Sequence, residues 1–452
     1  MINPYQDTIV APATIPGTGA ISIVRISGPE AFRITDSVVR LASGTVSDAA
    51  GYTLHYGEVP GLDQVLVSVF RAPHSYTGED SVEVSTHASA YIVQELVRLL
   101  LEAGARFAEP GEFTRRAFLN GKMDLTQAEA VADVISSGNA AAHRVAMNQL
   151  KGGFSKELAS LRSELLEMAS LLELELDFSE EDVEFADRSK LLNLLDEGKK
   201  HVDRLASSFH QGNLVKNGVP VAIVGPANAG KSTLLNALVG EERAIVTDIP
   251  GTTRDTLEET LTLGGILFRF IDTAGIRASE DTVEKLGIER SFRAIDQAEI
   301  VLVMQDATKE SAFNLEDKRL QGKTVFQIYN KADLLKESEY NNIVNDSNIF
   351  VISAKYGRGI EELKDGLYQS VKDLVPNADS TFVTNIRHFE ALTQASAALT
   401  DCRSALSLGV PSDLVAEDLR RALASINAIL GTDLLDPEVI LHSIFSKHCI
   451  GK

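Results

Sequence analysis

The chain has 452 residues, of which 24% are charged and 44% apolar, and its formal net charge is −21. This length is too great for one hydrophobic core, so roughly two to four domains are expected, and the composition excludes a fibrous or disordered chain. The acidic balance excludes a protein that grips nucleic-acid phosphates over its whole surface, because such a surface must be basic.

Two cysteines, Cys402 and Cys449, are too few for a disulfide framework and fit a reducing cytosol, so a cytoplasmic protein is expected. The N-terminus lacks a basic region followed by an apolar run. No stretch reaches about 18 consecutive apolar residues, so no membrane span is expected. The terminal CIGK superficially copies a prenylation signal, but Gly451 and Lys452 fit that signal poorly.

Residues 1–118 mix short strand-like runs with turns. AISIVRIS, QVLVSVF and SVEVST are rich in Val and Ile, as strands are, and IVQELVRLLLEAGA has the periodicity of an amphipathic helix. An α+β N-terminal domain is therefore predicted.

Residues 119–212 have a helical period instead. Apolar residues recur every three or four positions and predict one buried helical stripe, namely Leu158, Leu161, Leu165, Met168 and Leu172. The acidic run DFSEEDVEFAD that follows is interpreted as a solvated loop.

Strands and helices alternate over residues 213–378. PVAIVG, LFRFIDT, EIVLVMQDA, TVFQIYN and NIFVISA predict strands of a parallel sheet with helices on both faces. Residues 379–452 return to helical patterns, with Gly431 as a predicted helix end. The chain is therefore expected to be a multidomain α/β protein, in which a doubly wound domain is inserted into a helical domain built from two segments.

The segment GPANAGKS, from Gly225 to Ser232, matches the phosphate-loop pattern G-x-x-x-x-G-K-[ST] between a predicted strand and helix. Its glycines let backbone N–H groups curl around phosphates, Lys231 adds positive charge at the β and γ positions, and Ser232 can ligate Mg²⁺. A simple glycine turn is the alternative, and the complete pattern in this context disfavours it.

Four further motifs follow the phosphate loop, three at the ends of predicted strands and one, GTTRDT, between the loop and DTAG. In DTAG, Asp272 suits a magnesium-bound water and Gly275 suits the γ-phosphate, while GTTRDT offers Thr253, preferred over Thr252, to the Mg²⁺ shell. In NKAD, the acceptor-only carboxylate of Asp333 favours guanine, because adenine lacks the N1–H. The SAK segment, 353–355, follows another strand, where backbone N–H groups could meet guanine O6. The predicted GTP-binding residues are Asn228, Ala229, Gly230, Lys231, Ser232, Thr233, Thr247, Asp248, Ile249, Pro250, Gly251, Thr252, Thr253, Asp272, Thr273, Ala274, Gly275, Asn330, Lys331, Asp333, Ser353, Ala354 and Lys355.

The residue after DTAG poses a mechanistic question. Many GTP-hydrolysing switches have a glutamine there that orients the attacking water. Here it is Ile276, whose side chain can neither donate nor accept a hydrogen bond.

These motifs resemble a TRAFAC-class GTPase with a hydrophobic residue after DTAG. The segments IVRISG, PGEFTRRAFLNGKMDLTQAEAVADVI, TDIPGTTRD and terminal CIGK extend the resemblance over essentially the whole chain, to the tRNA-modification GTPase family MnmE, also called TrmE. The resemblance implies a folate-binding and dimerisation domain (1–118), a helical domain (119–212 and 379–452) and an inserted Ras-like G domain (213–378).

The resemblance also implies an activity and partners. The family works as a homodimer with the flavoprotein MnmG, in a heterotetramer, on carbon 5 of the wobble uridine (U34) of certain tRNAs. It adds an aminomethyl or carboxymethylaminomethyl group, using a one-carbon unit of 5-formyl- or 5,10-methylene-tetrahydrofolate, with FAD on the partner. An acidic chain is compatible with this arrangement if the partner supplies much of the RNA contact.

The resemblance implies that a K⁺ ion bound between two paired G domains compensates for the missing glutamine. Together with Mg²⁺, it would neutralise the charge that develops on the phosphates in a water-poor site. Catalysis is expected from Lys231 and from Glu284, a carboxylate beyond DTAG that orients the water. On its own, Glu284 would be interpreted as a solvated helix residue. The K⁺ ligands carry over to Asn228, Thr247, Ile249 and Thr252, and the Mg²⁺ ligands to Ser232 and Thr253.

The folate-binding residues carry over to Arg25, Glu83, Lys122 and Lys452. A carboxylate suits the paired N–H donors of a pterin, and cations suit the glutamate tail. Cys449 matches a family cysteine near the folate, and an inert thiol remains an equal alternative. The departures are Thr18, where the family has arginine, and Ala88-Ser89, where it has two glycines, so the family's folate-site geometry does not carry over there as an expectation.

Two other functions remain open from the sequence. One is a ribosome-assembly or signalling GTPase, which would carry the same nucleotide motifs, typically beside a basic RNA-binding module. The other is a folate-dependent transferase with a decayed G domain, disfavoured because Lys231, Ser232, Asp272 and Asp333 are all present.

Overall fold

The structure is a computed structural model that describes residues 7–177, 188–240, 259–271, 292–309, 318–336, 348–374, 381–432, 444–445 and 451. The chain divides into two compact units. The first unit comprises Met1–Ile135, Gln149–Lys199 and Gln394–Lys452, and the second comprises Ser136–Asn148 and Lys200–Thr393. Each unit is described by itself.

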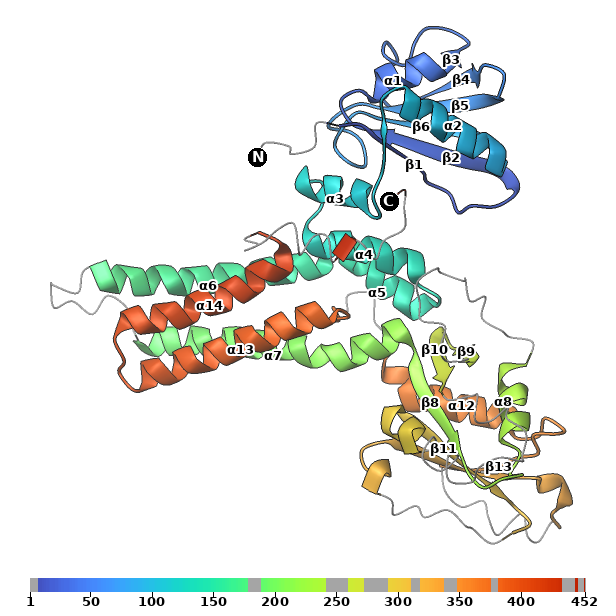
Figure 1. Cartoon of the computed structure of the whole chain (residues 1–452). Coiled ribbons are helices and arrows are strands. Elements are labelled where there is room, and N and C mark those ends of the chain that lie inside the picture. The colour runs from blue at the N-terminus through green and yellow to red at the C-terminus, as the bar shows by residue number, and fades with distance from the viewer. Residues whose placement is uncertain are drawn as a thin grey trace. The chain divides into compact units, whose positions relative to one another are not determined.

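The N-terminal part of the first unit is a seven-stranded, mostly antiparallel sheet in the order β3-β4-β5-β6-β2-β1-β7, with two helices on one face (Figure 1). The predicted strands and helix of this region are confirmed. The strands are β1 (Ile9–Pro12), β2 (Gly19–Ser27), β3 (Arg40–Leu41), β4 (Thr53–Val59), β5 (Asp63–Phe70), β6 (Ser81–Ala88) and β7 (Arg106–Phe107), and the helices are α1 (Ala31–Val38) and α2 (Ala90–Glu102).

Strand alternation gives this sheet one buried and one open face. On β5, Val65, Val67 and Val69 are buried in the core with α1 and α2. The residues between them, including Leu66, point to the other face. Arg25 on β2 and Glu83 on β6 lie directly opposite each other on that open face.

The other described elements of the first unit are helices, and the predicted stripe in α6 is confirmed. Its five residues, from Leu158 to Leu172, are all fully buried. Helices α6 and α14 lie side by side, and Arg162 Nε donates to Asn427 Oδ1 at 2.7 Å between them. Gly431 ends α14 in a left-handed conformation (φ +77°), as predicted. The first unit holds α3 (Glu112–Leu119), α6 (Gly153–Asp177), α14 (Ser412–Leu430) and all of α4 (Leu125–Ser136) but its last residue. Most of α5 (Ala140–Leu150) belongs to the second unit, and α7 (Arg188–Asn217) and α13 (Ile386–Ser407) contribute residues to both.

The second unit is built on a six-stranded sheet in the order β13-β12-β11-β8-β10-β9. One apolar core packs α8 and α12 on one face, and another packs the helical residues 292–297 on the opposite face, so the predicted cover of both faces is confirmed. The strands are β8 (Val219–Val224), β9 (Glu259–Leu263), β10 (Ile266–Phe270), β11 (Ile300–Asp306), β12 (Thr324–Asn330) and β13 (Ile349–Val351). The helices are α8 (Lys231–Val239) and α12 (Ile360–Val371), with 3-10 turns η1 (Lys318–Leu320), η2 (Ala332–Leu334) and η3 (Lys372–Leu374).

The expectation of an all-parallel sheet is wrong at one edge. β9 pairs antiparallel with β10, because Gly264 (φ +56°) and Gly265 (φ +84°) make a two-residue hairpin turn between them. A Cβ on Gly264 would lie 2.2 Å from the ring of Tyr368, so glycine is required there. The carbonyl of Gly265 accepts a hydrogen bond from the Ala141 N–H at 3.1 Å, which joins the hairpin to the start of α5.

None of the helices in the described parts of the chain is long and apolar enough to cross a membrane. Cys402 is a buried free thiol, and burial raises its pKa to about 12.

Candidate functional site

The phosphate loop lies between β8 and α8, as the sequence predicts. Gly225 (φ +149°) passes so close to β11 that a Cβ would lie 2.1 Å from the carbonyl of Met304. Asn228 (φ +61°) and Gly230 (φ +96°) both adopt the left-handed region and turn the chain into the first turn of α8. Asparagine is among the few residues that tolerate this conformation. The backbone therefore favours asparagine at position 228 independently of the predicted K⁺ site, and its side chain is exposed.

Lys231 is the first residue of α8 and curls back over the loop. Its Nζ donates to the carbonyls of Gly225 at 2.8 Å and Pro226 at 2.9 Å. Burial lowers the pKa of this ammonium from its ordinary value. Ser232 and Thr233 follow in the same helical turn, and a hydroxyl at 232 is the hard oxygen ligand that Mg²⁺ prefers.

The N-K-x-D segment is attached to the phosphate loop through one amide. Asn330, 4% exposed, donates from Nδ2 to the carbonyl of Ala229 at 2.8 Å and accepts at Oδ1 from the N–H of Ala354 at 3.0 Å. Gly230 must lack a Cβ, because that atom would lie 2.4 Å from the same Nδ2. Three separate predicted motifs therefore meet at one edge of the sheet, beyond the carboxyl ends of β8, β12 and β13.

The carboxylate of Asp333 is held by the third motif. Oδ1 of Asp333 accepts from Ser353 Oγ at 2.5 Å, and Ser353 is fully buried. The N–H groups of Ser353 and Ala354 already donate to the Arg358 carbonyl and to Asn330 Oδ1. The prediction that an N–H group of the SAK segment binds guanine O6 therefore applies to the N–H group of Lys355.

Lys331 has a partner that sequence reasoning missed. Its Nζ lies 2.7 Å from Oδ2 of Asp306, the last residue of β11. The signal was present, because Asp306 ends a strand at the same edge of the sheet. The remaining predicted nucleotide and cation residues lie outside the described part of the chain, and they are Thr247, Asp248, Ile249, Pro250, Gly251, Thr252, Thr253, Asp272, Thr273, Ala274, Gly275 and Glu284.

In the first unit, the structure brings Arg25 and Glu83 together. Arg25 Nε donates to Glu83 Oε1 at 2.9 Å, and the two side chains are 18% and 23% exposed. The guanidinium also lies 5.3 Å from the ring centre of Tyr76 and 5.6 Å from that of Phe113. These two aromatic neighbours were not predicted.

The chain end reaches the same place. Arg25 Nη1 donates to the carbonyl of Gly451 at 3.3 Å, and a Cβ on Gly451 would lie 2.1 Å from the Pro12 carbonyl. Cys449 and Lys452 themselves lie outside the described residues. Lys122 is exposed and donates from Nζ to the carbonyl of Pro73 at 2.9 Å.

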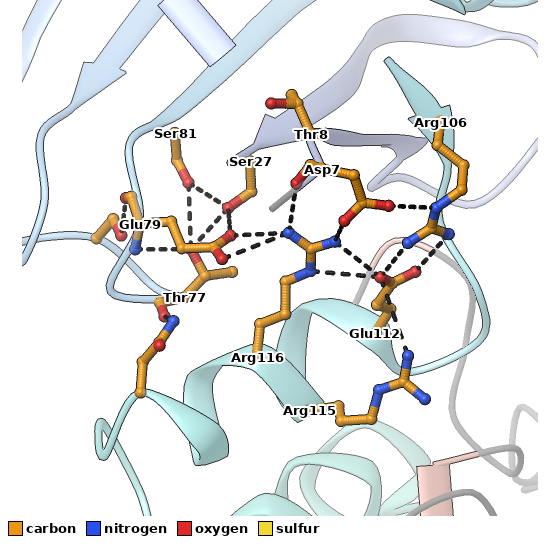
Figure 2. A network of polar contacts seen from close by, with 12 residues as sticks. Asp7, Thr8, Ser27, Thr77, Glu79, Ser81, Arg106, Glu112, Arg115 and Arg116 are labelled. Atoms are coloured by element: carbon orange, nitrogen blue, oxygen red, sulfur yellow. Dashed lines mark hydrogen bonds and ion pairs between the residues drawn. The ribbon is translucent and has the colours of Figure 1, made fainter. Parts of the chain in front are cut away.

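A buried charge network fixes the helix that carries Phe113 (Figure 2). Arg116 of α3 is fully buried, and its Nη2 contacts Asp7 Oδ1 at 2.7 Å and Glu112 Oε1 at 3.0 Å, while Nη1 reaches Glu79 at 3.3 Å. Burial acts to raise the pKa of Glu112, but hydrogen bonds from Arg106, the Glu109 N–H and Arg116 hold it below its ordinary value.

The same helix orders Tyr76. The Tyr76 hydroxyl lies 2.8 Å from Oγ1 of Thr114, the residue that follows Phe113 in α3. Burial raises the pKa of Tyr76, so the phenol stays neutral. The charge network and this hydrogen bond together hold the two aromatic rings near Arg25.

The phosphate loop is hydrogen-bonded to a buried asparagine of the N-K-x-D turn, and the same turn carries the carboxylate of Asp333. These features define a GTP-binding protein of the phosphate-loop class. Sequence comparisons define the chain further. A family model described as "MnmE helical domain" matches residues 125–449, and one described as "GTP-binding protein TrmE N-terminus" matches residues 8–122.

Full-length relatives agree with these models. The "tRNA modification GTPase MnmE" of Bacteroides thetaiotaomicron is 50% identical over 467 residues, covering 99% of this chain and 100% of that protein. That of Flavobacterium johnsoniae is 49% identical over 470 residues, covering 100% of both. The solved FeoB G-domain from Methanococcus jannaschii is 26% identical and covers 34% of this chain and 97% of its own, but its TM-score of 0.24 supports no conclusion.

The chain belongs to the tRNA modification GTPase MnmE family. The predicted enzyme class, a GTPase of tRNA modification, and the predicted multidomain α/β fold class are thereby confirmed.

Proposed function

We propose that the chain is the GTP-hydrolysing subunit of a complex that modifies carbon 5 of the wobble uridine of tRNA. The product carries an aminomethyl or carboxymethylaminomethyl group, and the carbon comes from 5-formyl- or 5,10-methylene-tetrahydrofolate. One observation supports this proposal above the others. The second unit contains a phosphate loop joined to the N-K-x-D turn, and the first unit contains the Arg25–Glu83 pair. A signalling GTPase would need only the nucleotide site.

In the nucleotide site, the roles follow from the chemistry of each group. Lys231 neutralises charge on the β- and γ-phosphates, and Asp333 accepts the N1–H and amino group of guanine. Ser232, with Thr253, would hold Mg²⁺, whose charge would offset that of the phosphates. Asn228, Thr247, Ile249 and Thr252 would hold K⁺ between paired G domains, and Glu284 would orient the attacking water.

The N-terminal site fits a reduced folate in its donors and acceptors. Glu83 offers carboxylate oxygens to the pterin N–H groups, and Arg25 holds that carboxylate in place at 2.9 Å. Lys122 and Lys452 would meet the acidic glutamate tail. Bound folate supplies a one-carbon unit; the residues of the chain bind and orient it.

A homodimer is supported by the open face of the N-terminal sheet. Leu54, Tyr56 and Leu66 lie there, 61%, 52% and 42% exposed, and Tyr56 is directly opposite Leu66 across β4 and β5. Exposed apolar side chains gathered on one face are typical of an interaction surface. Arg25 and Glu83 share this face, so a second copy of the chain would also border the folate site.

The other components follow from the reaction. The flavoprotein MnmG, with FAD, would complete a heterotetramer and contribute RNA contacts, because this chain has a net charge of −21. tRNA is the substrate, so the complex would act in the cytoplasm, where tRNA is used.

The experiment is a turnover assay with the purified chain, MnmG, a folate donor and unmodified tRNA, with and without GTP. The proposal requires modified uridine in the complete mixture and none without GTP or folate. Arg25→Gln should abolish folate binding in a direct titration and leave GTP hydrolysis unchanged. Arg40→Gln, an exposed arginine of the same sheet, is the matched control. Modification without GTP, or full activity of Arg25→Gln, would refute it.

A further inference from the structure

The ammonium of Lys331 is held by a carboxylate from the neighbouring strand. Asp306 ends β11, pairs in register with Asn330 at the end of β12, and so lies beside the first residue of the following turn. Its Oδ2 is 2.7 Å from Lys331 Nζ, and the Asp306 side chain is only 9% exposed. The Lys331 side chain is 33% exposed, so the buried carboxylate is the fixed partner of this pair.

The carboxylate is itself fixed from its other side. Oδ1 of Asp306 accepts from the N–H of Thr308 at 3.1 Å and from its Oγ1 at 2.7 Å. Burial acts to raise the pKa of Asp306, but the hydrogen bonds from Lys331 and Thr308 lower it to about 2, so the carboxylate is charged at neutral pH. Asp306 therefore cannot turn away from Lys331 without losing these contacts.

The backbone of Lys331 is held as firmly as its ammonium. It has φ +69°, which is uncommon for a residue with a side chain and costs free energy that its surroundings must offset. Asn330 before it is hydrogen-bonded to Ala229 and Ala354, and the N–H of Ala332 after it donates to the Ile352 carbonyl. With both ends held, the four methylene groups of Lys331 have few alternative paths between them.

We propose that Asp306 is a positioning residue of the nucleotide site, which holds the methylene stem of Lys331 as one wall against the purine ring. The inference rests on the proposed guanine site. A lysine stem is an apolar surface when its charged head is anchored elsewhere, and the flat face of a purine is its complement. Asp306 acts through Lys331 and touches neither phosphates nor the attacking water, so it contributes to nucleotide affinity and not to the chemical step.

The test compares Asp306→Asn in the full chain and in a Lys331→Met background, with a fluorescent GDP analogue as probe. Methionine keeps an unbranched stem and removes the ammonium. In the otherwise unchanged protein, Asp306→Asn should weaken binding about tenfold, the scale of one hydrogen bond to a charged group. The turnover number at saturating GTP should stay within about twofold of the parent value, because only ground-state binding is lost. In the Lys331→Met background, Asp306→Asn should weaken binding no further.

Two other variants keep the result interpretable. Glu361→Gln removes an exposed carboxylate paired with Lys364 in the same unit and should leave GDP binding unchanged. Thr308→Val alters an exposed side chain and loosens Asp306 without removing its charge, so a smaller loss of affinity is expected even if Asp306→Asn does not fold.

Equal weakening by Asp306→Asn in both backgrounds, or none in the parent, would overturn the inference. So would a fall in turnover number as large as the loss of affinity. A parent protein that does not prefer GDP to ADP would instead refute the guanine site itself, which separates the two failures.

Discussion

The side-chain amide of Asn330 donates to the backbone carbonyl of Ala229, with 2.8 Å between Nδ2 and the oxygen. This contact joins residues 101 positions apart in the chain. The same amide accepts from Ala354, so the phosphate loop, the N-K-x-D turn and the SAK segment share one buried group. One buried side chain therefore links the segments predicted to bind the phosphates and the base.

Asn330→Ala should destabilise the second unit and weaken GTP binding. It leaves the Ala229 carbonyl and the Ala354 N–H without their partner, and each buried polar group left unsatisfied costs about 1–3 kcal/mol. Thermal melting and GDP titration check this. Asn217→Ala, which changes an exposed amide at the end of α7, is the control. Identical melting of the two variants would contradict the structural role.

Asp333→Asn should reduce the preference for GTP over ATP. The substitution turns one of two acceptors into a donor, which faces the N–H groups of guanine, while the bond from Ser353 can persist through Oδ1. We expect GTP affinity to fall by roughly tenfold to a hundredfold, since hydrogen bonds to charged groups are lost. Competition filter binding with GTP, ATP and XTP measures it, with the exposed Asp365→Asn as control. An unchanged GTP preference would reject the assignment.

Parts of this site and fold followed from local sequence patterns. Continuous apolar runs such as IVLVM identify strands buried on both faces, and β11 is buried along its whole length. The phosphate loop is recognisable because its glycines meet steric demands that few residues satisfy, as Gly225 and Gly230 show.

Other features depend on long-range contacts and were not predictable. Arg116 would be expected at the surface as a charged residue. Asp7 and Glu79 reach it from distant positions in the chain, and with Glu112, one turn earlier in α3, they allow its full burial. β9 was missed because ETLTL is short and polar, and its pairing depends on the Gly264–Gly265 turn. The contact of Asp306 with Lys331 was also missed, although the position of Asp306 at the end of a predicted strand placed it at the right edge of the sheet.

Arg116→Leu should destabilise the N-terminal sheet and α3 strongly. It leaves Glu112 and Glu79 buried without their shared cation, and breaking a buried ion pair in this way costs about 3–5 kcal/mol. Hydrogen exchange of β1, β6 and α3 amides in the full chain reports this. Arg98→Leu, which removes an exposed arginine of α2, is the control. Equal protection in both variants would show that the network adds no stability.

The same network predicts how stability depends on pH. The pKa values of Glu112 and Asp7 are held below their ordinary values of 4.5 and 3.8, against burial, by hydrogen bonds from Arg106 and Arg116. A lowered folded pKa stabilises the protein above the unfolded value, and that contribution is lost as pH falls through the folded pKa. Exchange protection of α3 should therefore fall below about pH 4.5, less steeply in Glu112→Gln. A pH-independent profile would contradict this.

GTP hydrolysis should be faster in KCl than in NaCl at equal ionic strength, because the proposed cation site between paired G domains selects K⁺. Glu284→Ala should slow hydrolysis with little change in GTP affinity, since its proposed role is in the transition state. Single-turnover assays and equilibrium titration separate the two quantities. Equal rates in both salts would reject the cation, and a large loss of GTP binding would make Glu284 a structural residue.

The most direct measurement is mass spectrometry of tRNA nucleosides from a strain that lacks this chain, complemented with the parent protein or with Lys231→Ala. Lys231 contributes the phosphate-binding charge, and its ammonium lies over the loop at Gly225 and Pro226. The account predicts that the carbon-5 modification of wobble uridine disappears on deletion, returns with the parent protein and stays absent with Lys231→Ala. Modified wobble uridine in the deletion strain, or full restoration by Lys231→Ala, would contradict it.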